Sequence, residues 1–498
     1  MTAPLTFPEV SISPEVLAWL RDSNRWWQAE PLPALPSWRR WLFEPALQRI
    51  KNGLAPVTVL RGPRQVGKSV LQVQIIDHLL HVEHIQPQRI FRVQFDELPA
   101  FHSLTPVLTL CRWFERHVLG DTFNAQARQG KPAFLFFDEV QDVDHWAPQI
   151  KALVDHHSVR VMLTGSSALR IEAGRDSLAG RVSTLELGGL LLREVGALRG
   201  WETLPPLLPI ANGVGQLTER EFWETLRAHG QRHHAARDQS FTAFSERGGY
   251  PVAQARADRP WEEIADQLNE TVIQRVLQHD LALDQEAEQH LLEAAFRLAC
   301  RYAGQAPGAP VFVSEIHSSL GLTVRWQRVL NYLKRLSDSL LLRLTPALEL
   351  RLKRQRASPK LCLCDHALRA AWLQEIVPLT PAGLERSPHL SDLAGHLAES
   401  VLGYFLGSIP NLDLAWFPQR GAEPEVDFVM TVGEHRIPLE IKYRHRVDGH
   451  RDTLGLRAFI EKSAYNAPFG VLVTLTDDNP VTDPRIVTLP LSSLLLMR

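Results

Sequence analysis

The stretch VTVLRGPRQVGKSVLQVQIIDHLL, residues 57–80, decides the fold of the amino-terminal half of the chain. Its first five residues form a short apolar run typical of a buried strand, and its last twelve have the pattern of a helix. The glycine-rich turn between them fits G-x-x-x-x-G-K-[ST], in which successive backbone N–H groups at a helix N-terminus can surround a phosphate chain. The predicted phosphate-binding residues are Gly62, Pro63, Arg64, Gln65, Val66, Gly67, Lys68 and Ser69.

Two side chains of this turn are expected to make the specific contacts. Lys68 reaches the β- and γ-phosphate oxygens of a nucleotide, and the Ser69 hydroxyl holds Mg²⁺. Lysine occurs at only nine positions of the chain, so a lysine inside a motif is informative. The motif therefore predicts ATP and Mg²⁺ as cofactors.

Later segments supply the groups that hydrolysis needs. The run AFLFFDEV, residues 133–140, reads as a buried strand followed by Asp138, which would steady Mg²⁺, and Glu139, which would polarise the attacking water. A second apolar run, VRVMLTGSS, ends in Thr164, Ser166 and Ser167, whose hydroxyls could contact the γ-phosphate or the water. The pair Asp138 and Glu139 predicts an ATP hydrolase, with Ser166 as a further candidate. An ordinary Gly-Ser-Ser turn is the alternative for the last segment.

Arginines in the following segment are candidates for a finger that stabilises charge in the transition state. Arg175 and Arg181 lie in EAGRDSLAGRV, which reads as a loop. Either could act in cis or on a neighbouring subunit, and the second case predicts a homo-oligomer. A solvated loop arginine is the alternative for each.

Composition sets limits on the class of protein. The 498 residues are 45% hydrophobic and 22% charged, which is ordinary globular composition for several domains. The formal net charge is -2, so a nucleic-acid surface would have to be local. Four cysteines form no disulfide framework or spaced zinc site, and no signal peptide or spanning segment is recognisable. We expect a cytoplasmic protein without membrane contact.

The periodicity changes along the chain predict an α/β fold in five parts. An N-terminal helical segment (1–55), with tryptophans as packing anchors, precedes an α/β core with parallel strands (56–212). A helical lid (213–288) follows. A helix, a glycine turn, a basic helix and a strand then suit a winged helix-turn-helix (289–375). A smaller α/β domain (376–498) ends the chain.

This last domain carries a second set of charged residues. Asp427 lies on the strand pattern EVDFVM, and Glu440 and Lys442 share one face of the next strand, LEIKY. With Glu399 from the preceding helix pattern, these carboxylates could hold a divalent metal and activate a water, as in PD-(D/E)xK nucleases. A hairpin with exposed charges is the alternative.

Basic residues cluster in the predicted winged helix. Four lie on the helix TVRWQRVLNYLKRL, and the loop after the following strand adds four more. Such a face would neutralise phosphates without reading base sequence, which predicts DNA binding. A solvated face or an intersubunit surface is the alternative. The residues are Arg325, Arg328, Lys334 and Arg335 on the helix, and Arg351, Lys353, Arg354 and Arg356 on the loop.

Short sequence motifs spread over nearly the whole chain resemble those of one known group of proteins. The chain is similar to prokaryotic AAA+-type ATPases that carry a C-terminal restriction-endonuclease-like domain of poorly defined role. The resemblance implies the order ATPase core, helical lid, winged helix and nuclease-like domain. The matching words are RWW (25–27), GPRQVGKS (62–69), FFDEVQDV (136–143), LTGSS (163–167), LAGR (178–181), GGYP (248–251), SPKLCLCDHAL (358–368), GHLAES (395–400), EVDFVM (425–430) and LEIKY (439–443).

These observations together predict a Mg²⁺-dependent ATPase that acts on DNA, with hydrolysis driving or gating a nuclease-like module. One alternative is a motor that binds branched DNA such as a Holliday junction without cutting it, because junction resolvases share the carboxylate and Glu-x-Lys layout. A second alternative is an ATP-dependent protein-interaction switch with an inactive nuclease-like domain.

Overall fold

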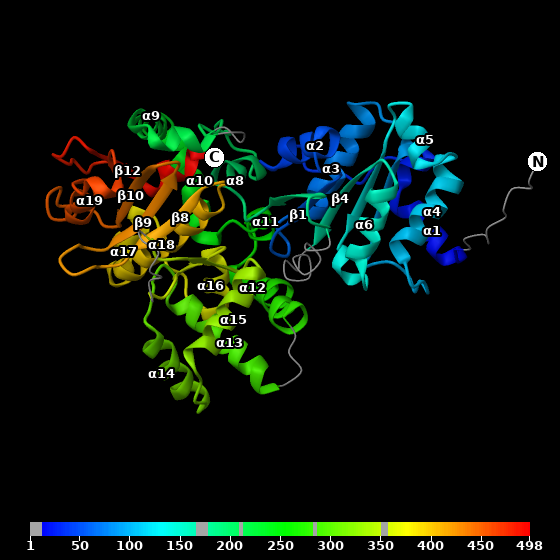
Figure 1. The fold of residues 1–498 in the computed structure, drawn as a ribbon. Helices are drawn as coiled ribbons and strands as arrows, with labels where there is room; N and C mark the ends of the chain where they lie inside the picture. The colour runs from blue at the N-terminus through cyan, green and yellow to red at the C-terminus, as the bar shows by residue number, and fades with distance from the viewer. Residues whose placement is uncertain (1–11, 166–177, 209–212, 282–285, 350–356) are drawn as a thin grey trace, which may run out of the picture. The chain divides into compact units, whose positions relative to one another are not determined.

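The computed structural model describes residues 12–165, 178–208, 213–281, 286–349 and 357–498 (Figure 1). The chain forms two compact units, residues 1–62 with 67–187 and residues 63–66 with 188–498. Several predicted site residues lie outside the described ranges, and these are Ser166, Ser167, Arg175, Arg351, Lys353, Arg354 and Arg356.

The first unit is built on a parallel five-stranded sheet with strand order β2-β3-β4-β1-β5. The apolar runs predicted as strands at VTVLR, AFLFFD and VRVMLTG are confirmed as β1, β3 and β4, and β5 is an additional strand that the sequence pattern did not reveal. Every residue of β3 is buried, because helices cover both faces of a parallel sheet. The strands are β1 (Val57–Arg61), β2 (Ile90–Gln94), β3 (Ala133–Asp138), β4 (Val159–Gly165) and β5 (Val182–Glu186).

The connections from β1 to β2, from β2 to β3 and from β3 to β4 contain helices, as crossovers between parallel strands usually do. Apolar residues of these helices join those of the strands in one core cluster that includes Val59, Leu110, Leu135 and Ile150. The helices are α3 (Lys68–His81), η2 (Pro87–Arg89), α4 (Pro106–Phe114), η3 (Glu115–Leu119), α5 (Phe123–Arg128), η4 (Val140–Asp142) and α6 (Trp146–His156).

The N-terminal helices α1 (Pro14–Ser23), η1 (Arg25–Gln28) and α2 (Phe43–Asn52) belong to this unit. The indole N–H groups of Trp26 and Trp27 both donate to the Ile90 carbonyl, at 3.2 and 3.0 Å. Asn24 exchanges two hydrogen bonds with the Arg92 backbone, at 2.7 and 2.9 Å. The predicted role of these tryptophans as anchors is therefore confirmed, and their partner is strand β2.

The second unit begins with a helical segment, followed by three helices and an antiparallel hairpin. The hairpin strands β6 (Leu342–Thr345) and β7 (Lys360–Leu363) close a helix, helix, helix, hairpin order. The helical segment comprises α8 (Leu192–Leu198), η6 (Gly213–Thr218), α9 (Arg220–Arg232), α10 (His234–Arg247), α11 (Pro251–Ala255), α12 (Trp261–Leu268), η7 (Asn269–Gln274) and η8 (Val276–Asp280). The three helices are α13 (Glu286–Arg301), α14 (Ala309–Leu320) and α15 (Trp326–Asp338).

A mixed five-stranded sheet of order β12-β11-β10-β9-β8 completes the second unit. Strands β8, β9 and β10 run antiparallel, whereas β10, β11 and β12 run parallel. The strands are β8 (Asp413–Phe417), β9 (Val426–Val432), β10 (His435–Lys442), β11 (Gly470–Thr474) and β12 (Ile486–Pro490). The helices around them are α16 (His366–Leu373), α17 (Pro381–Arg386), η9 (Pro388–Leu390), α18 (Ser391–Gly407), α19 (Leu454–Ile460), η10 (Ser463–Tyr465), α20 (Leu491–Leu494) and η11 (Leu495–Met497).

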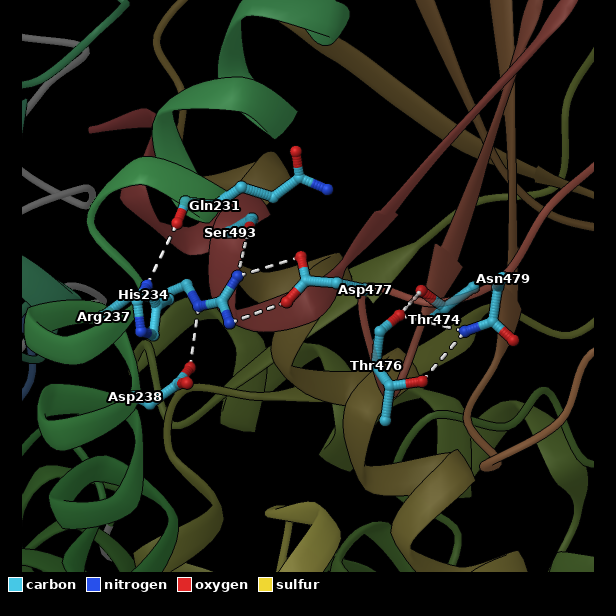
Figure 2. Close-up of polar contacts among 9 residues, drawn as sticks. All are labelled: Gln231, His234, Arg237, Asp238, Thr474, Thr476, Asp477, Asn479 and Ser493. Atoms are coloured by element: carbon cyan, nitrogen blue, oxygen red, sulfur yellow. Dashed lines mark hydrogen bonds and ion pairs between the residues drawn. The ribbon is translucent and has the colours of Figure 1, made fainter.

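One buried arginine links the helical segment to this sheet (Figure 2). Arg237 of α10 donates to both carboxylate oxygens of Asp477, at 2.9 and 3.1 Å, and to the Ser493 hydroxyl of α20 at 2.8 Å. Asp238 accepts from the Nε of the same guanidinium at 2.7 Å. The segment predicted as a lid, 213–288, therefore packs within the second unit against its C-terminal sheet.

All four cysteines are free thiols with buried side chains. In the part of the chain that the structure describes, no helix has both the length and the apolar character that a membrane span requires.

Candidate nucleotide site and a second carboxylate cluster

The phosphate loop leaves the carboxyl end of β1 and enters α3. Gln65 and Gly67 have positive φ angles of 60° and 93°, and Gly67 directly precedes the helix. Glycine adopts this backbone conformation without the strain that a β-carbon brings. The buried Lys68 ammonium donates to the Gly62 carbonyl at 3.0 Å. The lysine is thus held at the loop and the helix N-terminus, where both the charge and the backbone N–H groups favour phosphate.

The two predicted carboxylates follow strand β3. Asp138 is buried, accepts from Arg92 Nη2 at 2.9 Å and also accepts from the Thr164 hydroxyl. The backbone N–H of Glu139 donates to Thr164 Oγ1 at 3.3 Å, and its side chain accepts from Gln141. Because β4 lies between β1 and β3, the carboxyl ends of three parallel strands bring Lys68, Thr164 and Asp138 to one edge of the sheet.

Sequence reasoning missed two residues near this edge. Arg92 interrupts the apolar strand β2 and joins Asp138 to Gln72 of α3, with Nε to Oε1 at 3.1 Å. An arginine inside an apolar run was a signal that could have been followed. Asp96 comes just after the same strand, and partial burial together with the charges of Glu139 and Asp138 raises its pKa to about 6. Three carboxylates, those of Asp96, Asp138 and Glu139, therefore lie near one another at this edge, and Arg92 pairs with one of them.

The oxygen donors at this edge suit a hard divalent cation. The Ser69 hydroxyl and the Asp138 carboxylate are the ligand types that Mg²⁺ accepts, usually together with several waters and nucleotide phosphates. A bound Mg²⁺ would neutralise part of the phosphate charge. Lys68 and Ser69 are consecutive at the start of α3, so the loop could present both to the same phosphates.

Arg181 lies elsewhere in the first unit. Its carbonyl accepts from the Val57 N–H, which places it at the amino end of β1 and β5, the edge opposite the phosphate loop. Its guanidinium forms a two-bond ion pair with Asp155 of α6, with distances of 2.5 and 3.1 Å. The expectation that Arg181 could act in cis on the same nucleotide is wrong, because the strand length separates the two edges. A role on a neighbouring subunit stays a prediction.

The C-terminal residues predicted to converge do so on strands β9 and β10. The antiparallel register pairs Leu439 with Phe428, so Glu440 lies across from Asp427. Asp427 Oδ2 accepts from the Ile441 N–H at 2.8 Å, and Lys442 Nζ lies 2.6 Å from Glu440 Oε1. Antiparallel cross-strand neighbours have β-carbons about 5 Å apart. The Asp427 and Glu440 side chains therefore lie close together, as the sequence analysis predicts.

A lysine that the sequence analysis did not select completes this cluster. Lys360 of β7 is fully buried, and its Nζ lies 2.7 Å from Glu399 Oε2 and 3.1 Å from Asp427 Oδ1. Burial and the Asp427 charge raise the pKa of Glu440 to about 8. Burial opposes ionisation of Asp427 too, but the charges of Lys360 and Lys442 outweigh it and lower the pKa of Asp427.

The expectation that Glu399, Asp427 and Glu440 share a metal ion does not fit this arrangement. Among the described residues, no group of three or more His, Cys, Asp or Glu side chains is arranged to hold a metal ion. The physical reason lies in the ion pairs, because an ammonium group already bridges Glu399 and Asp427. Glu440 Oε2 is buried without a hydrogen-bond partner in the described structure, but it is one carboxylate only.

The predicted basic helix is α15. Arg325, Lys334 and Arg335 are exposed, and none of them forms an ion pair with the residues that the structure describes. Arg328 is exposed as well but pairs with Glu288 of α13 at 2.7 Å. Gln327 and Asn331 are also exposed, so the outer face of α15 is basic and amide-bearing. Arg354, predicted for the same surface, lies outside the described residues.

Two family models match parts of the chain, one mainly in the first unit and one in the second. Residues 55–196 match an AAA domain, and residues 238–377 match a domain of unknown function, DUF8612. The uncharacterized proteins Rv2008c of Mycobacterium tuberculosis and Mb2031c of Mycobacterium bovis are each 26% identical over 417 residues, covering 80% of this chain and 73% of the relative.

Two solved structures align more distantly. The ORC2 protein of Aeropyrum pernix has 13% identity and a TM-score of 0.36, covering 64% of this chain and 90% of that chain. The Walker-type ATPase PABY2304 of Pyrococcus abyssi has 13% identity and a TM-score of 0.38, covering 69% and 99%.

The AAA-domain match coincides with the parallel sheet, the phosphate loop and the Asp138–Glu139 pair. The chain is an ATP hydrolase with a P-loop, and this loop lies at the carboxyl edge of the first sheet.

Proposed function

We propose that ATP hydrolysis in the first unit drives or gates an action of the second unit on DNA. The observation that carries this proposal is the outer face of α15. Lys334 and Arg335 project from α15, the third helix of the order α13, α14, α15, β6 and β7, and Arg325 is the residue that caps its N-terminus. In a winged helix this is the element that enters the major groove. Exposed cations that form no ion pair with the described residues are available to neutralise phosphates.

The C-terminal sheet supports a nuclease-like module. Helix α18, the antiparallel strands β8, β9 and β10, helix α19 and the parallel strand β11 follow one another, with Asp427, Glu440 and Lys442 on the two central strands of this series. This order is similar to that of PD-(D/E)xK nucleases. We favour the form in which the module contacts DNA, branched DNA included, without cutting it. The reason is that Lys360 already bridges two of the carboxylates that cleavage would need.

Two further features belong to the proposal. Mg²⁺ accompanies ATP, for which Ser69 and Asp138 offer suitable oxygen ligands. The active form is a homo-oligomer in which Arg181 of one subunit faces the nucleotide of the next. Its exposed position beside Asp155 is compatible with a subunit surface.

The DNA proposal is tested with a charge-removal variant of α15. Arg325→Ala, Lys334→Ala and Arg335→Ala together should weaken binding to single-stranded, duplex and four-way DNA alike. They should also flatten the plot of log affinity against log salt by about 0.9 for each duplex phosphate that the variant no longer neutralises. Binding is measured in EDTA by fluorescence anisotropy, and ATPase rates are measured with each DNA. We expect at least one DNA to raise the wild-type rate.

The matched control removes the same charge from a different surface. Arg220, Arg227 and Arg232 are exposed on α9, and their replacement by alanine should leave DNA affinity nearly unchanged. If the α15 variant binds DNA as the wild type does at low and high salt, the surface contacts something else. If in addition no DNA alters the ATPase rate, the protein-interaction switch becomes the better account.

A further inference from the structure

The Lys360 side chain lies in a site built for one ammonium group. Its Nζ is within 2.7 Å of Glu399 Oε2 and 3.1 Å of Asp427 Oδ1, and it lies 4.9 Å from the centre of the Phe428 ring. The side chain is fully buried, so these groups replace its water shell. An aromatic face and two carboxylates are both favourable partners for a desolvated cation.

The strand that carries Lys360 is fixed on several sides. Leu361 exchanges backbone hydrogen bonds with Gly304 and Gln305, at 2.6 and 2.9 Å. The Leu363 N–H donates to the Ser400 hydroxyl of α18 at 2.9 Å, and Lys360 itself pairs with Thr345 in the hairpin. The backbone at Lys360 is therefore held by hydrogen bonds on both sides, and its ammonium group contacts the carboxylates from this fixed strand.

Two further basic side chains lie against carboxylates of this cluster. Lys442 pairs with Glu440 at 2.6 Å, and His396 Nδ1 of α18 lies 3.7 Å from Glu399 Oε1. Asp427 uses its second oxygen to accept the Ile441 N–H. Glu399 and Asp427, the two carboxylates that a divalent metal would bridge, thus already share the ammonium group of Lys360.

We propose that Lys360 is the resident cation of this cluster and takes the place of a divalent metal between Glu399 and Asp427. The wild-type C-terminal module then binds no divalent cation there. Removal of the lysine should create a site for a hard divalent cation, because the buried Asp427 and the mostly buried Glu399 repel each other without their counter-ion. This inference concerns the module of the proposed function, but it can be tested without DNA and without ATP.

The experiment compares Lys360→Met with Lys442→Met in the full-length, nucleotide-free protein. Methionine keeps most of the lysine's volume and removes its charge. Mn²⁺ binding is followed by electron paramagnetic resonance of the free ion. Lys360→Met should bind one more equivalent of Mn²⁺ than wild type. Its affinity for that ion should be at least about tenfold tighter than any wild-type binding in the same titration, and tenfold corresponds to about 1.4 kcal/mol of binding free energy. The double variant with Asp427→Asn should lose that equivalent. Lys442→Met, which leaves the Lys360 bridge intact, should not gain it.

Thermal unfolding gives a second readout. Lys360→Met should unfold at a lower temperature than wild type and recover on addition of Mn²⁺, whereas wild type should not respond through this site. If Lys360→Met does not fold, wild type and Glu399→Gln are titrated alone, and equal Mn²⁺ binding by the two supports the proposal. A wild-type equivalent that Glu399→Gln or Asp427→Asn removes would overturn it. Because DNA binding is measured in EDTA, that outcome leaves the α15 test unaffected.

Discussion

Asp138 and Glu139 are adjacent in sequence, yet their surroundings give them different chemistry. Asp138 ends a fully buried strand and is already held by Arg92 and by the Thr164 hydroxyl. Glu139 is half-buried, and its φ of 47° turns the chain out of the strand. We therefore expect Glu139 to orient a water toward the γ-phosphate and Asp138, whose carboxylate is held in place, to serve Mg²⁺.

Glu139→Gln should slow ATP hydrolysis by a factor of about 10² to 10⁴ while leaving ATP affinity within a few-fold of wild type, because glutamine keeps the shape but cannot accept the proton. Phosphate release and equilibrium binding of a fluorescent nucleotide measure the two effects. Lys68→Ala should instead lose binding, since it removes a phosphate ligand. Turnover at the wild-type rate in Glu139→Gln would remove this residue from the mechanism.

The predictable residues of both sites are those whose motifs are local. Lys68 and Asp138 each stand at the junction of an apolar strand with the next element, and Glu440 and Lys442 are two positions apart on one strand. Lys360 is different, because it meets Glu399 and Asp427 only through contacts 39 and 67 residues apart in sequence. Lys360 lies in the motif SPKLCLCDHAL, which forms part of the family resemblance. The periodicity of a sequence, however, gives no information on which distant carboxylates a lysine contacts.

At the scale of elements, the sequence predicted strands whose residues are apolar and buried, and it missed one whose residues are not. Strands β1, β3 and β4 are mainly apolar and buried, whereas β5 is only partly buried and reads VSTLE. The GGYP stretch, which the family resemblance singles out, forms a turn whose partner is distant in sequence. The Gly249 N–H donates to Asp365 Oδ2 at 2.5 Å, and Asp365 Oδ1 caps α16 by accepting from Ala367.

The same turn explains why Gly248 is a glycine. Its φ is 69°, and a β-carbon there would collide with Asp365 Oδ1. Two motifs of the family resemblance, GGYP and CDHAL, thus pack directly against each other.

The contact between α10 and the C-terminal elements yields a stability prediction. Arg237→Ala should lower the free energy of unfolding by about 3 kcal/mol, because it leaves the Asp477 carboxylate without its two-bond partner in a mostly buried place. Urea unfolding of Arg237→Ala, Asp477→Ala and the double variant gives the coupling energy between them.

Asp238 provides the matched control for that cycle. It pairs with the same guanidinium, but its side chain is 55% exposed, so Asp238→Ala should cost no more than about 1 kcal/mol. Equal losses for Asp238→Ala and Asp477→Ala would mean that the bridge to the C-terminal sheet contributes no more than a surface pair.

At the scale of the whole molecule, the five parts predicted from the sequence do not correspond one to one with the two compact units of the structure. The sequence divides the chain into five parts by periodicity, and the elements within each part largely agree with the structure. The N-terminal segment nevertheless belongs to the first unit through Trp26 and Asn24, and the predicted lid joins the second unit through Arg237. Periodicity reports which residues form a helix or a strand, whereas unit boundaries depend on side chains that meet from distant segments.

The ionisation of Glu440 should make the stability of the second unit depend on pH. Its folded pKa of about 8 lies above the ordinary value of 4.5, so the folded state holds this proton more tightly than the unfolded chain. The resulting stability is complete below pH 4.5 and is lost as pH rises through 8. Between pH 6 and 9 we expect the free energy of unfolding to fall by on the order of 2 kcal/mol from this group, since one pKa unit corresponds to about 1.4 kcal/mol.

Glu440→Gln isolates this contribution, because glutamine has no proton to lose and other titrating groups remain. Denaturant unfolding of both proteins at pH 6, 7, 8 and 9 should give curves that converge at low pH and separate in favour of the variant as pH rises. Keeping the series at or below pH 9 limits ionisation of the buried cysteines, whose pKa values burial raises above 9. Parallel curves over the whole range would mean that Glu440 is ionised already at pH 6, with Lys442 and Lys360 together sufficient to hold its charge in the buried cluster.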